Sequence, residues 1–222
     1  MKAQEQELPL KDRVNNALAR HWKFAVLSLV AVVAVMAGIL VLRSMNEERR
    51  ARAAIMAEDI QESFVEWIAA ASEDRDSSTL EALIDEALAD YPSTFAAQRA
   101  LYTKGLMALE NEAWEEASES FLLLADEWEE SYLASVSLYN AASALEEQGK
   151  DDEAVSVLQQ LVDEYDQISP DVPDALYQLG RLAEKRGEME EALAAYKDIA
   201  ARFPQSRWNG LGKTRILVIE GR

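Results

Sequence analysis

The sequence predicts an all-α protein in which a single transmembrane helix is followed by a stack of helical hairpins. Three observations lead to this fold class. Residues 24–42 are apolar and carry no charge. Beyond them, apolar residues recur at spacings of three and four, which is typical of amphipathic helices. Three segments also repeat one another at intervals of 37 and 38 residues, as expected of hairpins that stack.

Composition limits the chemistry of the chain. Of its 222 residues 49% are hydrophobic, so it can bury a sizeable core. It has no cysteine and one histidine, His21, which excludes disulfides, thiolate zinc sites, a Ser-His-Asp triad and a multi-histidine metal site. The sequence also lacks glycine-rich phosphate loops and calcium-ligand spacing. We therefore expect no enzyme activity, no cofactor, no metal and no small-molecule substrate.

Residues 24–42 (FAVLSLVAVVAVMAGILVL) are interpreted as an uncleaved transmembrane anchor between Lys23 and Arg43. As a helix they span roughly 28 Å, close to the hydrocarbon core of a bilayer. The run is longer than the apolar region of a cleavable signal peptide, about 7–15 residues. No small-x-small cleavage site ends it.

Residues 1–23 form a short tail that ends in a candidate interfacial helix. Its apolar residues follow helical spacing: Leu10, Val14, Ala17, Leu18 and Trp22. A plain extension of the anchor explains this spacing equally well. The nearest basic residues number four on each side of the anchor, so the positive-inside rule does not decide the topology. The interfacial helix and the short tail favour a cytoplasmic N-terminus, with the large domain outside the cytoplasm.

The three repeated segments begin at Leu101-Tyr102, Leu138-Tyr139 and Leu176-Tyr177. Each predicts a helix, a short turn and a second helix, with Asn111, Gly149 and Gly187 at the turns. Small residues are expected where the helices cross, and large residues in the next layer. The small residues are Gly105, Ala142, Gly180, Ala117, Ala154 and Ala192, and the large ones are Phe121, Leu158 and Tyr196.

This pattern resembles the tetratricopeptide repeat (TPR). In the third segment the matching residues are Leu179-Gly180, Gly187, Ala192, Tyr196 and Pro204. The resemblance covers residues 95–206 and implies a right-handed superhelix of about four hairpins. Residues 43–94 would supply membrane-proximal helices and a degenerate first repeat, whose second helix is opened by a capping box of Ser78 and Glu81. Residues 207–222 would form a solvating C-terminal capping helix.

The TPR resemblance also implies a concave face lined by first helices, which would bind a protein partner. The predicted partner-binding residues are Arg99, Tyr102, Leu106, Tyr139, Ser143, Tyr177, Arg181 and Lys185, with Leu109, Val136 and Asp174 on the same face. The three tyrosines form either a binding ladder or a packing layer between hairpins. The cations lack the spacing needed to capture a terminal carboxylate.

The charge of the chain belongs to the repeat region. Residues 53–222 hold 13 basic and 36 acidic residues, for a net charge near −23. Acidic runs fall at expected turns and helix starts, where they complement the helix dipole and keep the domain soluble. This charge argues against nucleic acid and anionic lipid as ligands, and favours basic protein partners.

One apolar anchor ahead of an acidic TPR-like domain resembles a group of bacterial inner-membrane TPR proteins related to the ancillary subunit of the Sec translocon. The shared motifs are Leu-Tyr-x-Leu-Gly-Arg-Leu at 176–182 and Phe-Pro-x-Ser at 203–206. The resemblance implies a single-pass protein of the inner membrane with its TPR domain in the periplasm. Its partners would be translocon subunits, a membrane-anchored chaperone of the prolyl-isomerase type, or exported clients. Because similar motifs occur in other envelope proteins, a structural adaptor of an envelope-assembly or cell-division complex that binds no client is the alternative.

Overall fold

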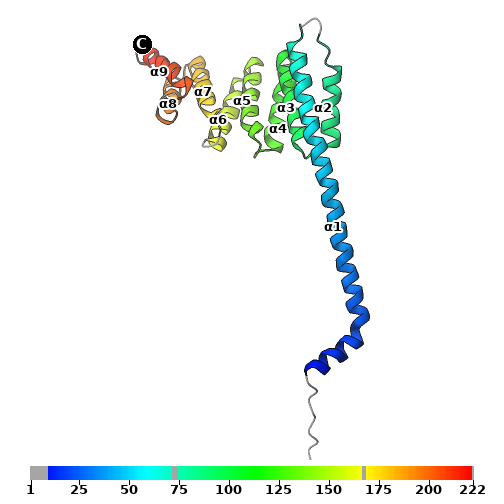
Figure 1. Ribbon diagram of the computed structural model, residues 1–222. Helices are drawn as coiled ribbons and strands as arrows, with labels where there is room; N and C mark the ends of the chain where they lie inside the picture. The colour runs from blue at the N-terminus through cyan, green and yellow to red at the C-terminus, as the bar shows by residue number, and fades with distance from the viewer. Residues whose placement is uncertain (1–9, 72–74, 167–168, 222) are drawn as a thin grey trace, which may run out of the picture. The chain divides into compact units, whose positions relative to one another are not determined.

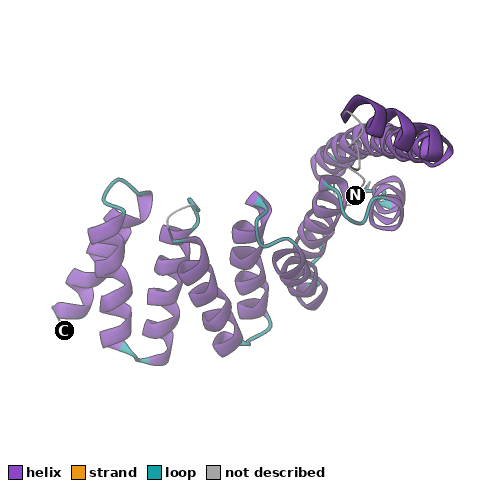
Figure 2. Cartoon of the chain, turned by 90° about the horizontal axis from the view of Figure 1, so that it is seen from below, coloured by secondary structure: helices purple, strands orange, loops and turns teal. Residues whose placement is uncertain are grey.

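The computed structural model describes the backbone of residues 10–71, 75–166 and 169–221, and the side chains of these residues apart from 10, 12–21 and 25. The backbone of the predicted interfacial helix is therefore described as part of a helix from Leu10 onward, whereas most of its side chains and all of residues 1–9 lie outside the described part of the chain. Over the described ranges the chain forms nine helices and no strand (Figure 2), which confirms the all-α prediction. The helices are α1 Leu10–Ala69, α2 Ser78–Asp90, α3 Phe95–Glu110, α4 Trp114–Glu127, α5 Tyr132–Glu147, α6 Asp151–Tyr165, α7 Val172–Arg186, α8 Met189–Arg202 and α9 Arg207–Glu220 (Figure 1).

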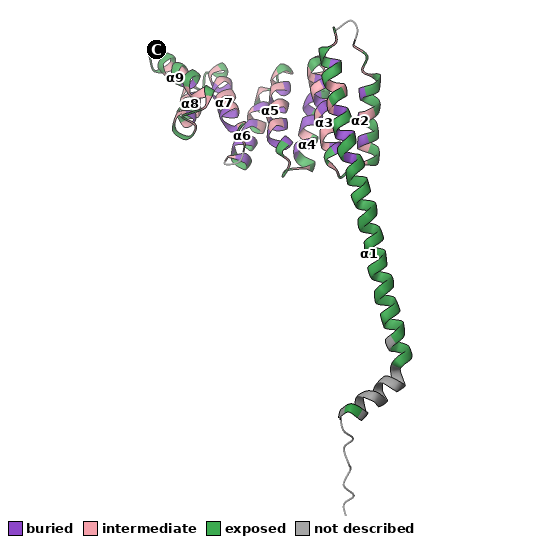
Figure 3. Cartoon of the chain, in the orientation of Figure 1, coloured by how far each residue is buried: buried purple, intermediate pink, exposed green. Residues whose placement is uncertain are grey.

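The chain divides into two compact units, residues 1–52 and residues 53–222. Helix α1 supplies the helical part of the first unit. An 18-residue window of α1 has a mean hydropathy of 2.9, and none of that window is buried (Figure 3). Among the described residues α1 is the one helix that is long and apolar enough to cross a membrane.

The second unit consists of consecutive helical hairpins. Helices α3 and α4, α5 and α6, and α7 and α8 form three hairpins, and each packs on the next. The segment of α1 from Ala53 onward packs with α2 and α3 as a first hairpin, while α9 packs on α8 and α7. The apolar cluster shared by α1, α2 and α3 contains Ala53, Met56, Ala57, Ile60, Trp67, Leu80, Ile84, Ala87, Ala96, Ala100 and Met107. The unit therefore has the four hairpins that the repeats predict.

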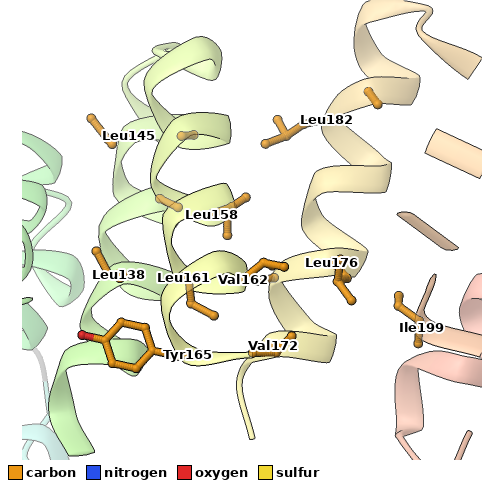
Figure 4. Packing of buried hydrophobic residues seen from close by; sticks show 14 of the residues in the cluster. Leu138, Leu145, Leu158, Leu161, Val162, Tyr165, Val172, Leu176, Leu182 and Ile199 are labelled. Atoms are coloured by element: carbon orange, nitrogen blue, oxygen red, sulfur yellow. The ribbon is translucent and has the colours of Figure 1, made fainter. Parts of the chain in front are cut away.

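The largest apolar cluster joins the later hairpins. Figure 4 shows Leu138 and Leu145 at different heights on α5, with Leu158 of α6 and Leu176 of α7, all of them members of this cluster. Each of these side chains is at most 5% exposed. Neither helix of a hairpin could bury this apolar surface alone, so the cluster makes each hairpin depend on the next.

Two glycines of the first helices allow a close helix crossing. A Cβ atom added at Gly105 would lie 2.7 Å from the ring of Phe121, and one added at Gly180 would lie 2.5 Å from the ring of Tyr196. Both rings are at most 1% exposed. The predicted alternation of small and large residues at the crossing is confirmed, because only a missing side chain leaves room for the ring.

A hydroxyl recurs at the start of the first helices from α3 onward: it belongs to the N-cap residue of α3, α5 and α9, and at α7 it lies two residues before the N-cap Asp171. Thr94, Ser131, Ser169 and Ser206 each accept a hydrogen bond from the backbone N–H two residues later, at 3.0–3.2 Å. These residues are separated by 37, 38 and 37 positions. In α3, α5 and α9 the hydroxyl satisfies an amide group that the helix leaves without an internal partner. All four hydroxyls mark the repeat independently of the core.

Two predicted helix ends differ from the structure by one residue. Ser77, not Ser78, is the N-cap of α2, and its hydroxyl binds Glu81 at 2.6 Å. The carboxylate of Asp76 instead accepts the N–H of Ser78 at 2.9 Å. In the first turn the left-handed residue is Glu112, with a φ of 58°, and not Asn111. Gly149 and Gly187 hold the corresponding left-handed positions, as expected.

The C-terminal helix meets its prediction only in part. Helix α9 begins at Arg207, as expected, and Gly212 is buried against Tyr196. Its outer surface, however, exposes Leu217 to 73% and Leu211 to 49%. A solvating cap would instead present polar side chains there.

The glycine crossing gives a testable expectation. Gly180→Ala should lower the free energy of unfolding by about 1–3 kcal/mol, because the new methyl group overlaps the buried ring of Tyr196. Gly212→Ala is the matched control, because its Cβ would come no closer than 3.6 Å to a neighbour. That change should stabilise α9 by roughly 0.5–1 kcal/mol through helix propensity. Urea unfolding followed by circular dichroism measures both, and equal stabilities of the two variants would contradict the crossing.

Tyr196 should also make the domain sensitive to alkali. Burial, together with the hydrogen bond that its hydroxyl donates to Glu184 at 2.8 Å, raises the pKa of Tyr196. The unfolded tyrosine ionises near pH 10, so its contribution to stability is complete below about pH 10 and declines above it. Tyr196→Phe should therefore flatten the loss of stability above pH 10 in urea titrations. An unchanged slope would show that this hydroxyl is not responsible.

Candidate partner-binding surface

The three predicted tyrosines occupy one register position on successive first helices. Tyr102, Tyr139 and Tyr177 lie on α3, α5 and α7, each eight residues after the recurring hydroxyl of its repeat. All three side chains are half-buried. The repeat thus places the rings at intervals of one hairpin, and part of each ring remains open to solvent.

Hydrogen bonds connect two of these tyrosines to the next hairpin. The Tyr102 hydroxyl accepts from Asn140 Nδ2 at 3.3 Å, and the Tyr139 hydroxyl accepts from Gln178 Nε2 at 3.3 Å. Asn140 and Gln178 each directly follow the tyrosine of their own repeat. Burial raises the pKa of Tyr102, whose ring also lies edge-on to Phe121 at 5.6 Å. These rings therefore bridge hairpins as well as facing outward.

Tyr177 has a different environment at the end of the stack. Its ring stacks on Trp208 with centroids 4.4 Å apart and lies 5.5 Å from Tyr196. Both contacts come from helices that follow α7. The stack on Trp208 connects Tyr177 of α7 with α9.

The three predicted cations are tied to neighbouring hairpins. Arg99 donates to Gln61 Oε1 at 2.6 Å and to the Tyr132 hydroxyl at 3.2 Å. Lys185 pairs with Asp151 at 2.8 Å. Arg181 donates to Glu146 at 2.8 Å, and this hydrogen bond raises the pKa of the guanidinium. All three cations therefore serve packing between repeats before any partner is bound.

Two carboxylates of this surface were not singled out from the sequence. Glu146 on α5 holds Arg181, and Glu184 on α7 accepts from Arg215 Nε at 2.8 Å as well as from the Tyr196 hydroxyl. The sequence signal that could have identified each carboxylate is an arginine about one repeat further along the chain, Arg181 for Glu146 and Arg215 for Glu184. Acidic runs at turns obscured that signal.

The remaining predicted residues lie on the same helices with smaller contacts. Leu106, Leu109, Val136 and Ser143 are half-buried, and the Ser143 hydroxyl donates to the Tyr139 carbonyl at 3.1 Å. Asp174 pairs with Arg207 at 2.6 Å. Together with the tyrosines they form a surface of aromatic rings, apolar side chains and carboxylates. Such a surface can bind a protein through van der Waals contacts and hydrogen bonds.

A separate groove lies between the second helices α6 and α8. It is an open groove of about 810 Å³, with walls formed by α6 and α8 and a base formed by α7. Its lining is mixed: apolar residues such as Val155, Val162 and Leu179 lie beside seven charged residues, which are Asp163, Arg186, Glu188, Glu191, Lys197, Asp198 and Arg202. None of the eight predicted partner-binding residues lines this groove.

Comparison with known proteins agrees with this geometry. Residues 139–207 match a family model described as tetratricopeptide repeat. A TPR repeat-containing protein of Treponema pallidum (strain Nichols) is 38% identical over 106 residues, which cover 48% of this chain. The match covers 44% of that relative, so the chain spans less than half of its length. The hairpins of this domain are thus similar in sequence to tetratricopeptide repeats, and such repeats generally mediate protein–protein interactions.

Proposed function

We propose that the chain is a membrane-tethered TPR scaffold of the bacterial inner membrane, with its repeat domain outside the cytoplasm. It recruits a membrane-anchored chaperone or an exported client near the protein-export translocon. The partner binds the surface formed by the first helices α3, α5 and α7.

The observation that carries this proposal is the repetition of half-exposed rings. Tyr102, Tyr139 and Tyr177 recur at one register position and keep part of their surface open after the hairpins have stacked. A tyrosine supplies a large contact area and a hydroxyl at low cost in side-chain entropy. A row of such rings suits an extended or helical protein segment.

The apolar segment of α1 supplies the second support. A tether of this kind holds the domain beside other membrane proteins and converts a second contact into an intramolecular event. A modest affinity of the first-helix surface for its partner is then sufficient for binding. The charge of residues 53–222, near −23, further favours a partner with basic surface.

Photo-crosslinking from Ser143 tests the proposed partner. Ser143 is half-buried on α5, one turn from Tyr139, so benzoylphenylalanine at this position would face the bound segment. We expect adducts that mass spectrometry identifies as a translocon subunit or its membrane-anchored chaperone. The same probe at Leu123, half exposed on α4, is the matched control and should give neither.

The outcomes separate the proposal from its alternative. Adducts made only with subunits of a stable envelope-assembly or division complex would support the structural adaptor instead. A topology reporter fused after Arg222 must also report a location outside the cytoplasm, and a cytoplasmic signal would overturn the proposal.

Tyrosine truncations should separate binding from stability. Tyr139→Ala removes a half-exposed ring with one described hydrogen bond, so we expect at least about tenfold weaker partner binding and about 1 kcal/mol less stability. Tyr177→Ala removes the stack on Trp208 and should cost about 2–4 kcal/mol. Calorimetric melting and a binding titration measure the two effects. A collapse of stability in Tyr139→Ala would show that this ring belongs to the core.

A further inference from the structure

The two ends of the hairpin stack leave apolar side chains exposed that an inner hairpin would cover. At the C-terminal end, α9 exposes Leu211, Leu217 and Val218. At the N-terminal end, the last turns of α1 expose Ile55 to 60% and Val65 to 52%. Repeat domains of this kind normally close their ends with polar faces. Apolar side chains at both ends therefore suggest surfaces that are covered in an assembly.

The ends also differ in charge. The segment Ala53–Ala69 of α1 and helix α2 together contain eight acidic residues and no basic residue. Helices α7 to α9, residues 172–220, contain eight basic and seven acidic residues. The C-terminal end is therefore the part of this acidic domain that the N-terminal hairpin can approach without charge repulsion.

The register of α9 argues against a further second helix on its outer surface. Leu217 lies eleven residues after the hydroxyl that begins α9, the position that Gly105 and Gly180 hold in α3 and α7. In those helices a ring of the following second helix fills the space that a side chain would take. A leucine occupies that space, so the same hairpin geometry cannot be repeated on α9.

We propose that α9 of one copy docks on the N-terminal hairpin of a second copy, in a head-to-tail contact. Leu211, Leu217 and Val218 would lie against Ile55 and Val65 of the neighbour. The exposed Lys213 of α9 would lie near the acidic residues of the neighbour's α1 and α2. The contact continues the helix stack from one copy into the next and, being heterologous, builds a row or a ring. This inference goes beyond the proposed function and does not depend on it.

Introduced cysteines test the contact directly, because the chain contains no cysteine of its own. Two full-length variants, Val65→Cys and Leu217→Cys, are purified in detergent, mixed and treated with a short bis-maleimide. We expect a crosslinked dimer from the mixture. Either variant alone should give at least about tenfold less, because a head-to-tail contact between two copies of one variant contains only one cysteine.

Other outcomes overturn the inference. Strong crosslinking of Leu217→Cys with itself would place α9 against α9 in a symmetric dimer. No crosslinking in the mixture, or equal crosslinking of Val65→Cys with the control Leu123→Cys, would show that the ends do not meet. Leu123 is the matched control because it is similarly exposed, at 50%, on the side of a second helix.

The dependence of assembly on salt and on an added charge tests the contact a second time, without introduced cysteines. Leu217→Asp places a carboxylate opposite the acidic hairpin and should shift the detergent-solubilised protein to monomer in sedimentation velocity, whereas Leu123→Asp should not. Raising the salt from about 0.05 M to about 0.5 M should weaken the assembly of the parent chain severalfold. An assembly that persists unchanged in Leu217→Asp would refute the contact.

Discussion

The close crossing of the two helices within each hairpin is the contact on which the domain depends. Where Gly105 and Gly180 carry no side chain, the rings of Phe121 and Tyr196 fill the space and become almost fully buried. In the middle hairpin the predicted equivalents are Ala142 and Leu158, at most 2% exposed. This interlock sets the spacing within a hairpin and thereby the position of the next one. The first-helix surface inherits its regular spacing from that geometry.

Charge pairing between hairpins shapes what the first-helix surface can recognise. Arg181, Lys185 and Arg215 each bind a carboxylate of a neighbouring repeat. These three side chains are already ordered by carboxylates of the domain itself, so they are poorly placed to capture a partner's acidic group. Recognition would then rest on the tyrosine rings and on acidic residues in excess of the available bases. For this reason the proposed partner is a basic or amphipathic protein segment and not a terminal carboxylate.

The sequence was sufficient for the architecture because its signals are local and repeated. Leu-Tyr pairs, glycines and buried rings recur at fixed spacing, and each has one physical role in a helical hairpin. The sequence did not predict the contacts of Glu146 and Glu184, because acidic residues are so frequent that no single one stands out before the hairpins are stacked. The start of α2 also differs by one residue from the prediction, because Ser77 and not Ser78 pairs with Glu81, while Asp76 accepts the N–H of Ser78. Exposure of Leu217 was also beyond sequence reasoning, since an apolar residue in an amphipathic helix is normally assigned to the core.

A stack of hairpins extends in one dimension and has two ends. Each inner hairpin is covered on two sides, whereas an end hairpin is covered on one. The proposed end-to-end contact involves only α9 of one copy and the N-terminal hairpin of the next, so it is a small interface. The proposed tether would anchor both copies in one membrane, raise their effective concentration and strengthen such a contact. End-to-end docking would then repeat the tyrosine surface along a row of copies, so that a long or multivalent partner could engage several domains with little affinity required of each.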